Sequence, residues 1–356
     1  MARNIMTTPK IAFIFTGQGS QYTNMAKQLY DTEVEFKETL NRCEKILQNH
    51  LDIPLTELLF NPTNAQKLNN TRYTQPALFA IEYSLFQTLN HWGIHPNCVL
   101  GHSVGEYVAA TVAGVMSLED GLMLIATRAK LMDSLPAGEG GMLAVLAPVD
   151  DVKKLAETFK QQHNAAVDIA AINSPKQIVF SGDNNVIKGL TDLFKANNMM
   201  AQPLTVSHAF HSSLMNPILA EFKTAAAKVE YHQPTITLIS NVTGEKTNHI
   251  DAEYWTNHIR QAVNFCAGIQ AASREGCTVF IEIGAHAALL ASGMQSVSTS
   301  GSCLWVPTLH RAQENWQTLL TTISKLHDAG VTINWTSLKD SYQRSGSQFK
   351  LPNLAL

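Results

Sequence analysis

The 356-residue chain is poor in charge and in cysteine, and it contains no long apolar run. Charged residues make up 15% of the sequence and the formal net charge is −3, which leaves no basic footprint for nucleic acid or for an acidic membrane surface. No run approaches the about 18 apolar residues of a membrane span, and the N-terminus lacks the roughly 7 to 15 apolar residues of a signal peptide. We therefore expect a cytoplasmic protein that has no nucleic-acid or membrane partner.

The five cysteines are odd in number and scattered, and no two of them form a CxxC pair. This distribution argues against a disulfide framework and against a structural zinc site, and it fits a reducing compartment. No metal-ligand cluster stands out either, because His249 and His258 are far apart and do not form a pair at helical ligand spacing. We expect neither a metal nor a dissociable cofactor.

What the chain does contain is typical of a globular α/β protein. Its length predicts about two domains or subdomains at roughly 150 residues each, and 45% of its residues are hydrophobic. An apolar run at 11–15 predicts a strand, followed by the glycine-rich loop TGQGSQ at 16–21 and a helix over 25–47. A second strand at 98–100 leads into GHSVG at 101–105, which opens another helix.

Residues 141–206 predict a unit of their own inside this larger body. The expected elements are strand 142–146, helix 149–160, strands 167–172 and 177–180, helix 184–197 and strand 200–206. The order βαββαβ is that of a ferredoxin-like subdomain. We place the large subdomain at 10–140 and 207–310, with helices near 214–228 and 262–274 and strands at 236–240 and 279–283. Residues 311–356 are expected to form a C-terminal helix and a linker-like tail, with a polar stretch at 341–347.

The GHSVG segment is the first candidate for catalytic chemistry. In a GxSxG turn between a strand and a helix, the two glycines tolerate the strained backbone, and the serine hydroxyl is exposed. The amide that follows the serine points at a developing oxyanion. The strand before and the amphipathic helix after Ser103 are the context that this motif requires, so we interpret Ser103 as a nucleophile. The alternative is a tight turn in which the serine caps the helix.

A serine nucleophile needs a base, and context must choose among thirteen histidines. His102 adjoins Ser103, and side chains of adjacent residues in a sharp turn diverge, which favours a packed histidine. In SHAFHSSLM at 207–215, His208 and His211 stand where the inserted unit returns to the large body, a boundary at which clefts form. His211 is the better candidate base, and interdomain packing is the alternative for each histidine.

Arg128 lies at the edge of the apolar stripe of an expected helix at 118–132, whereas Lys130 falls on its polar side. A guanidinium beside apolar surface requires an anion, and its planar fork matches a carboxylate. A snorkelling arginine or a structural salt bridge is the alternative.

The loop GQGSQ at 17–21 lacks the spacing and lysine of a phosphate-binding loop, so its glycines are better suited to bringing a backbone amide to a reacting centre.

Seven segments, in this order, resemble those of the malonyl-CoA:acyl carrier protein transacylases and of the acyltransferase domains of polyketide synthases. They are GQGSQ at 17–21, YTQPALFA at 73–80, GHSVGE at 101–106, RAKLM at 128–132, NSPKQIVFSG at 173–182, SHAFHSSLM at 207–215 and EIGAHAALL at 282–290. The resemblance covers about residues 10–310. It implies an α/β-hydrolase-like large subdomain with an inserted ferredoxin-like small subdomain, in agreement with the element order above.

The resemblance also implies roles for individual residues. Ser103 would be the acylated nucleophile and His211 its base, with the backbone amides of Gln18 and Val104 as the oxyanion hole. Arg128 would bind the free carboxylate of the donor. A main-chain carbonyl near Asn264, in QAVNF, would orient the histidine. The other substrate-binding positions would be Gln75, Asn173, His208 and Phe210.

The implied reaction moves a malonyl group from malonyl-CoA to the phosphopantetheine thiol of an acyl carrier protein, in polyketide or fatty-acid biosynthesis. In related polyketide acyltransferases, HAFH and an aliphatic residue after GHS go with malonyl donors, and this chain has HAFH at 208–211 and Val104. An acyl hydrolase that uses Ser103 and His211 is the alternative, and a binding module without turnover is a third reading.

The sequence departs from the family pattern at two places. The residues GAHA at 284–287 stand where the family has GPHP, although His286 is retained. Near the C-terminus, VTINW at 331–335 and LPNLAL at 351–356 resemble the linker that follows acyltransferase domains, but Asn353 and Leu354 stand where aromatic residues are expected. Because 356 residues hold no ketosynthase or carrier domain beside this one, we expect an enzyme that acts in trans.

Overall fold

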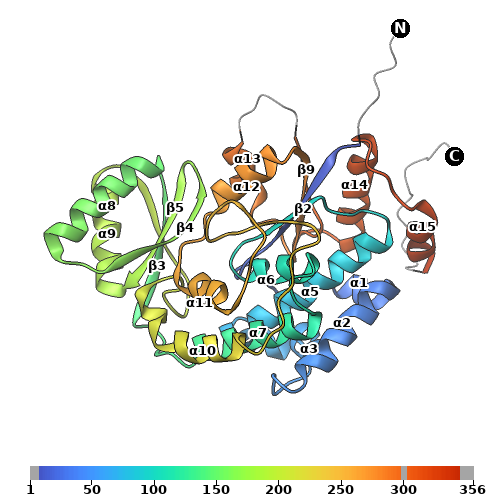
Figure 1. Ribbon diagram of the computed structural model, residues 1–356, viewed down its shortest axis with the longest axis horizontal. Coiled ribbons are helices and arrows are strands. Elements are labelled where there is room, and N and C mark those ends of the chain that lie inside the picture. The colour runs from blue at the N-terminus through green and yellow to red at the C-terminus, as the bar shows by residue number, and fades with distance from the viewer. Residues whose placement is uncertain (1–7, 298–302, 345–356) are drawn as a thin grey trace, which may run out of the picture.

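The large sheet forms the centre of the computed structural model, which describes residues 8–297 and 303–344 (Figure 1). Its strands, in the order β10-β9-β1-β2-β7-β8, are β10 (Leu304–Pro307), β9 (Cys277–Ile283), β1 (Lys10–Phe15), β2 (Cys98–Gly101), β7 (Thr237–Ile239) and β8 (Lys246–Thr247). All neighbours pair in parallel except β7 and β8. The carboxyl ends of β1 and β2, which lead into the two glycine-rich loops, therefore lie side by side.

Helices cover both faces of this sheet (Figure 1). The alternation of side chains along β1 explains why, because Phe13 and Phe15 enter one apolar cluster while Ala12 and Ile14 enter another. The first cluster lies under α2 (Val34–Leu47), α5 (Thr71–His91), α6 (Val104–Val112) and α7 (Leu118–Asp133). The second lies under α12 (Phe265–Arg274) and α13 (Leu290–Ser296).

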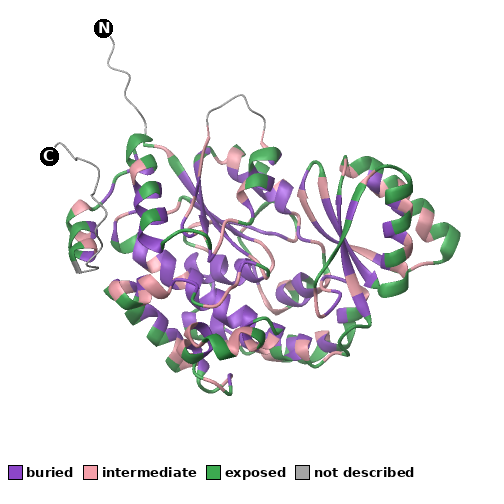
Figure 2. Cartoon of the chain, turned by 180° about the vertical axis from the view of Figure 1, so that it is seen from behind, coloured by how far each residue is buried: buried purple, intermediate pink, exposed green. Residues whose placement is uncertain are grey.

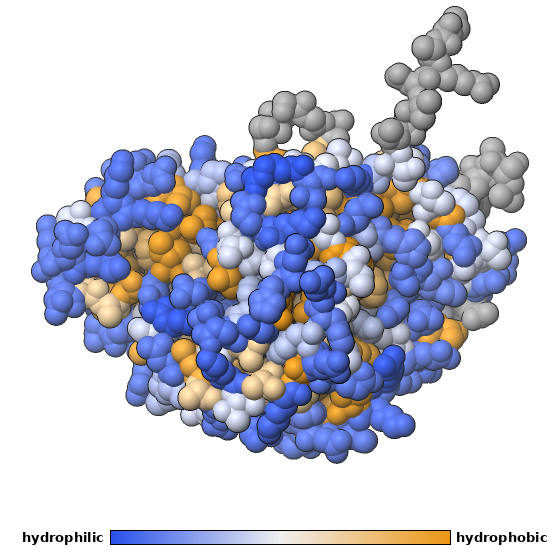
Figure 3. Space-filling view, viewed as in Figure 1, coloured by the Kyte–Doolittle hydropathy of each residue, from blue (hydrophilic) through white to orange (hydrophobic). Residues whose placement is uncertain are grey.

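The remaining helices are short or peripheral. They are α1 (Lys27–Thr32), α3 (Leu55–Phe60), η1 (Pro62–Asn64), α4 (Ala65–Leu68), η2 (Ser213–Ile218), α10 (Leu219–Ala226), α11 (Ala252–Arg260), α14 (Asn315–Asp328) and α15 (Trp335–Arg344). Within the described residues, no helix is long and apolar enough to cross a membrane. Figure 2 shows the buried residues concentrated in the strands and in the helices against them, and the face in Figure 3 is mainly hydrophilic.

Residues 140–204 form the second, antiparallel sheet with the predicted order βαββαβ. The elements are β3 (Gly140–Leu146), α8 (Val149–His163), β4 (Val167–Ser174), β5 (Gln177–Asp183), α9 (Asn184–Ala196) and β6 (Met200–Leu204), and the strand order is β4-β5-β3-β6. Its apolar core joins the sheet to α8 and α9 and includes Leu143, Phe180 and Phe194. Pro203 is tolerated in β6 because this strand is an edge, paired with β3 alone.

Backbone hydrogen bonds attach the small sheet to the loop between α11 and α12. Val263 forms an isolated parallel bridge with Ala171 of β4, and it exchanges hydrogen bonds of 2.9 Å with Ala170 and Ile172. The side chain of Asp168, also on β4, accepts a hydrogen bond from the amide of Ser213 at 2.8 Å. The small sheet is thereby attached to the two segments that flank the site described below.

Several predicted elements have different bounds in the structure. The helix expected over 25–47 is broken at Glu33, whose extended backbone and buried side chain cap α2. The helix expected near 262–274 begins at Phe265, and α11 precedes it. The polar stretch at 341–347 was expected to be linker, but its first residues complete α15, and Ser341 is buried. Residues 345–356, including LPNLAL, lie outside the described residues. All five cysteines are free thiols.

Candidate active site

The nucleophile turn is built where β2 ends and α6 begins. Ser103 connects them with φ 52° and ψ −105°, a backbone conformation that L-residues rarely adopt. Both neighbouring glycines are required by packing: a Cβ on Gly101 would clash with the first turn of α6, and one on Gly105 would clash with the carbonyl oxygen of Phe15. The strained serine is therefore held by close contact between β1, β2 and α6.

Ser103 and His211 form a hydrogen-bonded pair, with Oγ 2.8 Å from Nε2. The other ring nitrogen, Nδ1, lies 2.8 Å from the main-chain oxygen of Gln261. A carbonyl oxygen only accepts, so Nδ1 carries the ring proton and Nε2 has a free lone pair. The hydroxyl of Ser103 thus donates to Nε2, which is the direction that general-base catalysis requires.

The surroundings of His211 keep its ring neutral. Burial is the largest cause that lowers its pKa well below the ordinary value, and the positive charge of Arg128 and the neighbouring His258 act in the same direction. The carbonyl of Gln261 opposes them by bonding to the ring N–H. His211 itself has a positive φ of 56°. A neutral base is therefore available at and below neutral pH.

Arg128 is buried to 1% exposure, although it is a cation. One terminal nitrogen donates to Gln75 Oε1 at 2.7 Å and the other donates to Ser103 Oγ at 3.0 Å. Its guanidinium carbon lies 5.6 Å from the ring centroid of Tyr107. Burial lowers the pKa of Arg128, but a guanidinium stays protonated in proteins. Among the described residues, no carboxylate is hydrogen-bonded to this buried positive charge, which adjoins the serine, whereas Lys130 is exposed as predicted.

The glycine-rich loop after β1 lies against the nucleophile turn. A Cβ on Gly17 would approach within 2.8 Å of the carbonyl oxygen of His102, so the loop depends on a residue without a side chain there. The side chain of Gln18 donates to Thr71 Oγ1 at 3.1 Å and is turned toward α5. Val104 is the first residue of α6, and amides of a helix's first turn have no acceptor within the helix.

His102 and Asn173 contact each other across the two sheets. Nε2 of His102 lies 2.8 Å from Asn173 Oδ1, and burial lowers the pKa of this histidine. Its ring bonds Asn173 and not the adjacent Ser103, so His102 is the packed histidine that the turn geometry favours. Asn173 therefore attaches the end of β4 to the nucleophile turn.

His208 and Phe210 support the segment that carries His211. His208 is buried, with Nδ1 2.9 Å from Ser207 Oγ and Nε2 3.0 Å from the main-chain oxygen of Leu135. Both of its ring nitrogens thus have protein partners. Phe210 is half-buried and packs against both apolar clusters of the large sheet.

The carbonyl that accepts from His211 lies in QAVNF, the predicted segment, but it belongs to Gln261 and not to Asn264. Asn264 instead accepts from the amide of Gly268 as α12 begins, and its side chain donates to the carbonyl of Val242. The difference of three residues arises because α11 ends at Arg260 and leaves the next carbonyl unpaired by the helix. Sequence reasoning missed α11, and with it this register.

Three residues near the dyad were not predicted as part of the site. Glu106 and His258 are fully buried, and Asn241 accepts a hydrogen bond from the amide of Ser103 at 2.8 Å. Glu106 belongs to the GHSVGE segment, so a carboxylate in the apolar helix GEYVAATV was a visible signal. No comparable signal marks Asn241 or His258.

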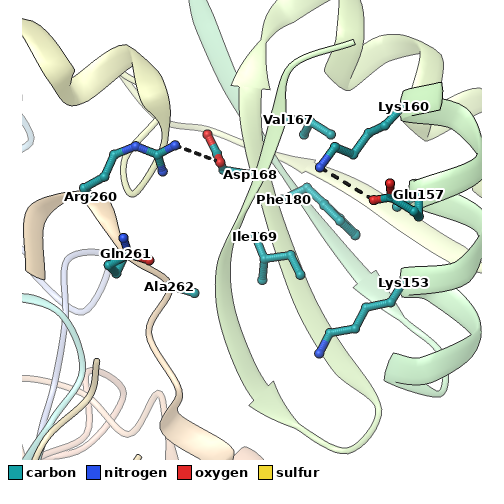
Figure 4. A pocket seen from close by; sticks show the side chains of 11 residues that line it. Lys153, Glu157, Lys160, Val167, Asp168, Ile169, Phe180, Arg260, Gln261 and Ala262 are labelled. Atoms are coloured by element: carbon teal, nitrogen blue, oxygen red, sulfur yellow. Dashed lines mark hydrogen bonds and ion pairs between the residues drawn. The ribbon is translucent and has the colours of Figure 1, made fainter. Parts of the chain in front are cut away.

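A pocket of about 500 Å³ lies behind the segment that orients His211 (Figure 4). It is lined by Gln261, Ala262, residues of β4 and lysines of α8, and Arg260 bonds Asp168 at its edge with 3.0 Å between the atoms. Neither Ser103 nor His211 lines it. Over residues 8–297 and 303–344, no group of three histidine, cysteine or acidic side chains is arranged to hold a metal ion.

This geometry is suited to a serine nucleophile, because the serine hydroxyl has a histidine acceptor, a carbonyl that orients this histidine and a buried cation beside it. The family model described as acyl transferase domain matches residues 12–333. The chain belongs to the acyl transferase domain family. The α/β fold and the resemblance inferred from the seven motifs are thereby confirmed.

Curated relatives include type I polyketide synthases. The chain is 40% identical over 333 residues to a phenolphthiocerol synthesis polyketide synthase of Mycobacterium marinum, and 39% identical over 331 residues to mycoketide-CoA synthase of Mycobacterium tuberculosis. Each match covers 92% of this chain but only 15% and 8% of the relative, so the chain spans one part of these long proteins.

Solved structures agree with this assignment. The acyltransferase domain from the second module of the salinomycin polyketide synthase has a TM-score of 0.87 at 34% identity, covering 97% of this chain and 79% of that one. A malonyl CoA-acyl carrier protein transacylase from Clostridium perfringens has a TM-score of 0.81 at 30% identity, covering 90% and 98%. The chain is therefore an acyltransferase domain of the polyketide synthase type.

Proposed function

We propose that this acyltransferase transfers a malonyl group from malonyl-CoA, through an ester on Ser103, to the phosphopantetheine thiol of an acyl carrier protein. The observation that carries the proposal is the buried guanidinium of Arg128, 3.0 Å from Ser103 Oγ. A donor that has a free carboxylate supplies the anion that this cation lacks, and Gln75 fixes the guanidinium plane. The transacylase from Clostridium perfringens, named for malonyl-CoA, supports the same donor.

The first half-reaction would proceed as general-base catalysis. Ser103 Oγ loses its proton to His211 Nε2 and attacks the thioester carbon, and the amides of Gln18 and Val104 donate to the oxyanion that forms. The carbon–sulfur bond then breaks, and His211 returns the proton to the departing thiolate, giving free CoA and the seryl ester. The carbonyl of Gln261 stabilises the transient imidazolium in place of an acidic third residue.

The second half-reaction reverses these steps with a different thiol. The phosphopantetheine thiol gives its proton to His211 Nε2, and its sulfur attacks the seryl ester. The carbon–oxygen bond breaks, the proton moves to Ser103 Oγ, and the malonyl group leaves as a thioester. No cofactor is consumed. Asn173, which joins β4 to the turn through His102, and the HAFH segment at 208–211 would line the path of the acyl group.

A hydrolase that passes the acyl group to water is the second candidate, because Ser103 and His211 would serve it equally. Arg128 favours the transferase, because a donor with a free carboxylate pairs with a buried cation. A hydrolase for monocarboxylic acyl chains has no use for such a cation beside the nucleophile.

The test is covalent labelling by radiolabelled malonyl-CoA, followed by chase with carrier protein. Ser103→Ala should abolish labelling, and His211→Ala should slow it by about 100-fold or more, as expected for a lost general base. Label in the wild-type enzyme should move to the carrier protein faster than it is released to water. Labelling that survives Ser103→Ala contradicts the nucleophile, and release to water alone favours the hydrolase.

A further inference from the structure

The carboxyl group of Glu106 is fully buried one helical turn after the nucleophile, and its contacts lead back to that nucleophile. Oε1 accepts hydrogen bonds from the amide of Asn241, at 3.1 Å, and from the hydroxyl of Tyr254. Oε2 lies 3.1 Å from Nε2 of His258, which is also fully buried. Among the described residues, neither of these last two atoms has another polar partner.

Asn241 connects this carboxyl group to Ser103. Its main-chain amide donates to Glu106, while its side-chain oxygen accepts from the main-chain amide of Ser103 at 2.8 Å. The amide of Ser103 belongs to the peptide bond between His102 and Ser103, directly before the strained φ of 52° at Ser103. An amide fixed there sets the direction of both the serine side chain and the following N–H.

We propose that Glu106 is the positioning residue of the nucleophile turn: it holds Asn241, and Asn241 holds the amide of Ser103 in its strained conformation, with His258 as the buried partner of the carboxyl group. Neither Glu106 nor Asn241 touches the base or the reacting atoms in this arrangement. The role is geometric and requires hydrogen-bond acceptance at Oε1, not negative charge. The proposal depends on Ser103 as nucleophile but not on the identity of the donor.

The protonation of the pair agrees with a geometric role. Burial is the dominant cause that raises the pKa of Glu106 to about 8, and burial also lowers the pKa of His258 well below its ordinary value. The groups that face the pair are the hydroxyl of Tyr254 and the rings of Tyr107, Trp255 and His211, and the cation of Arg128 lies over the ring of Tyr107. The side-chain amide of glutamine is close in shape to an uncharged carboxyl group, so glutamine is the conservative replacement for Glu106.

The experiment compares Glu106→Ala, Glu106→Gln and Asn241→Ala in the full chain. The readouts are the rate of Ser103 labelling by a small fluorophosphonate, which needs no carboxylate pocket, and kcat and KM with malonyl-CoA. Glu106→Ala and Asn241→Ala should each slow labelling by about 30-fold or more, because a nucleophile displaced by about 1 Å costs on the order of 100-fold. KM should stay within about 3-fold. Glu106→Gln should label within about 3-fold of the wild type.

Leu40→Ala, in the buried face of α2, serves as the control for general destabilisation, since it removes core packing away from the site. The double variant, with Glu106 and Asn241 both changed to alanine, should be no slower than the slower single variant, because both residues act through the same chain of hydrogen bonds.

Labelling of Asn241→Ala at the wild-type rate overturns the proposal. A glutamine variant as slow as Glu106→Ala also overturns it and makes charge the operative property. If Glu106→Ala does not fold, Asn241→Ala against Glu106→Gln still decides. Failure of malonyl transfer with normal labelling would contradict the proposed function and leave this inference intact.

Discussion

At the scale of single residues, the site depends on a cation and an imidazole that share a small buried volume. The guanidinium of Arg128 lies against Ser103, and its field disfavours a second positive charge on His211. Burial is the largest cause that lowers the pKa of His211, and the same arginine that would attract the donor's carboxylate adds to this effect. The two roles can be separated experimentally by choosing a reagent that has no carboxylate.

Arg128→Ala should move the acid limb of fluorophosphonate labelling to higher pH. The arginine lowers the pKa of His211, so its removal raises that pKa, and more of the histidine is protonated at pH 6. The ratio of labelling rates at pH 6 and pH 8 should fall relative to the wild type. Lys130→Ala, an exposed change on the same helix, should leave the ratio unchanged. An unaltered ratio in Arg128→Ala would show that burial alone sets the protonation of His211.

Phe210 should favour malonyl-CoA over methylmalonyl-CoA. Phe210 is half-buried and adjoins His211 in the chain, so its ring would fill space that a C2 methyl group needs. Excluding one methyl group by packing contributes about 1 to 3 kcal/mol, which is roughly 10 to 200-fold in kcat/KM. The measurement is competition between the two donors at equal concentration, with Phe210→Ser as the variant in which the preference narrows. Equal loading of both donors by the wild type would contradict this specificity.

At the scale of elements, the strand–turn–helix of Ser103 was predictable because its information is local. An apolar strand, two glycines and an amphipathic helix are adjacent in the sequence, and packing against β1 requires both glycines. Helix α11 was missed although Asp251 caps it and Trp255 and Ile259 lie one turn apart on its buried face, because its nine residues are fewer than the roughly 11 to 18 over which a helical period is read. The carbonyl that orients His211 follows α11 directly, so this missed helix is also why the acceptor was placed at Asn264 instead of Gln261.

Gly105→Ala and Gly268→Ala test the contact between helix and strand, because both glycines lie inside helices. A Cβ at Gly105 would overlap the carbonyl of Phe15, so we expect about 2 to 3 kcal/mol less unfolding free energy and loss of labelling. A Cβ at Gly268 would meet its nearest atoms at 3.5 Å, an ordinary contact, and should stabilise α12 by about 0.5 to 1 kcal/mol. Chemical denaturation measures both. Equal effects of the two substitutions on the unfolding free energy would show that the turn can shift to accommodate the methyl group.

At the scale of the molecule, the catalytic pair is assembled from segments that the small sheet separates in the chain. The βαββαβ order could be predicted because each strand and helix has its own periodicity. The attachment of β4 to Val263, and of Asp168 to Ser213 and Arg260, could not, because each contact joins residues far apart in sequence. The choice of His211 as the base for Ser103 rested on its position at the boundary of the inserted unit and on the family resemblance, because the two residues are also far apart in sequence.

Asp168→Ala should loosen this attachment near His211. The carboxylate accepts from the amide of Ser213, two residues after His211, and from Arg260, next to Gln261. Because the ion pair is partly exposed, the unfolding free energy should fall by only about 1 kcal/mol, whereas the transfer rate should fall several-fold. Asp168→Asn keeps an acceptor for Ser213 and should lose less. Glu245→Ala, in an exposed ion pair with Arg274, is the control. An unchanged rate in Asp168→Ala would show that the joint does not align the histidine.

Four of the five cysteine thiols, those of Cys43, Cys98, Cys266 and Cys277, are buried, and Cys303 is half-buried. Thiolates are the species that attack thioesters and alkylating reagents, and burial raises the pKa of Cys43 to about 12. Burial thus shields these four thiols from activated acyl groups, whereas Cys303 stays half-exposed. In a mixture with a carrier protein, a maleimide or iodoacetamide should then spare the buried thiols, so alkylation of a Cys303→Ser variant could report how much of the pantetheine arm is still unloaded.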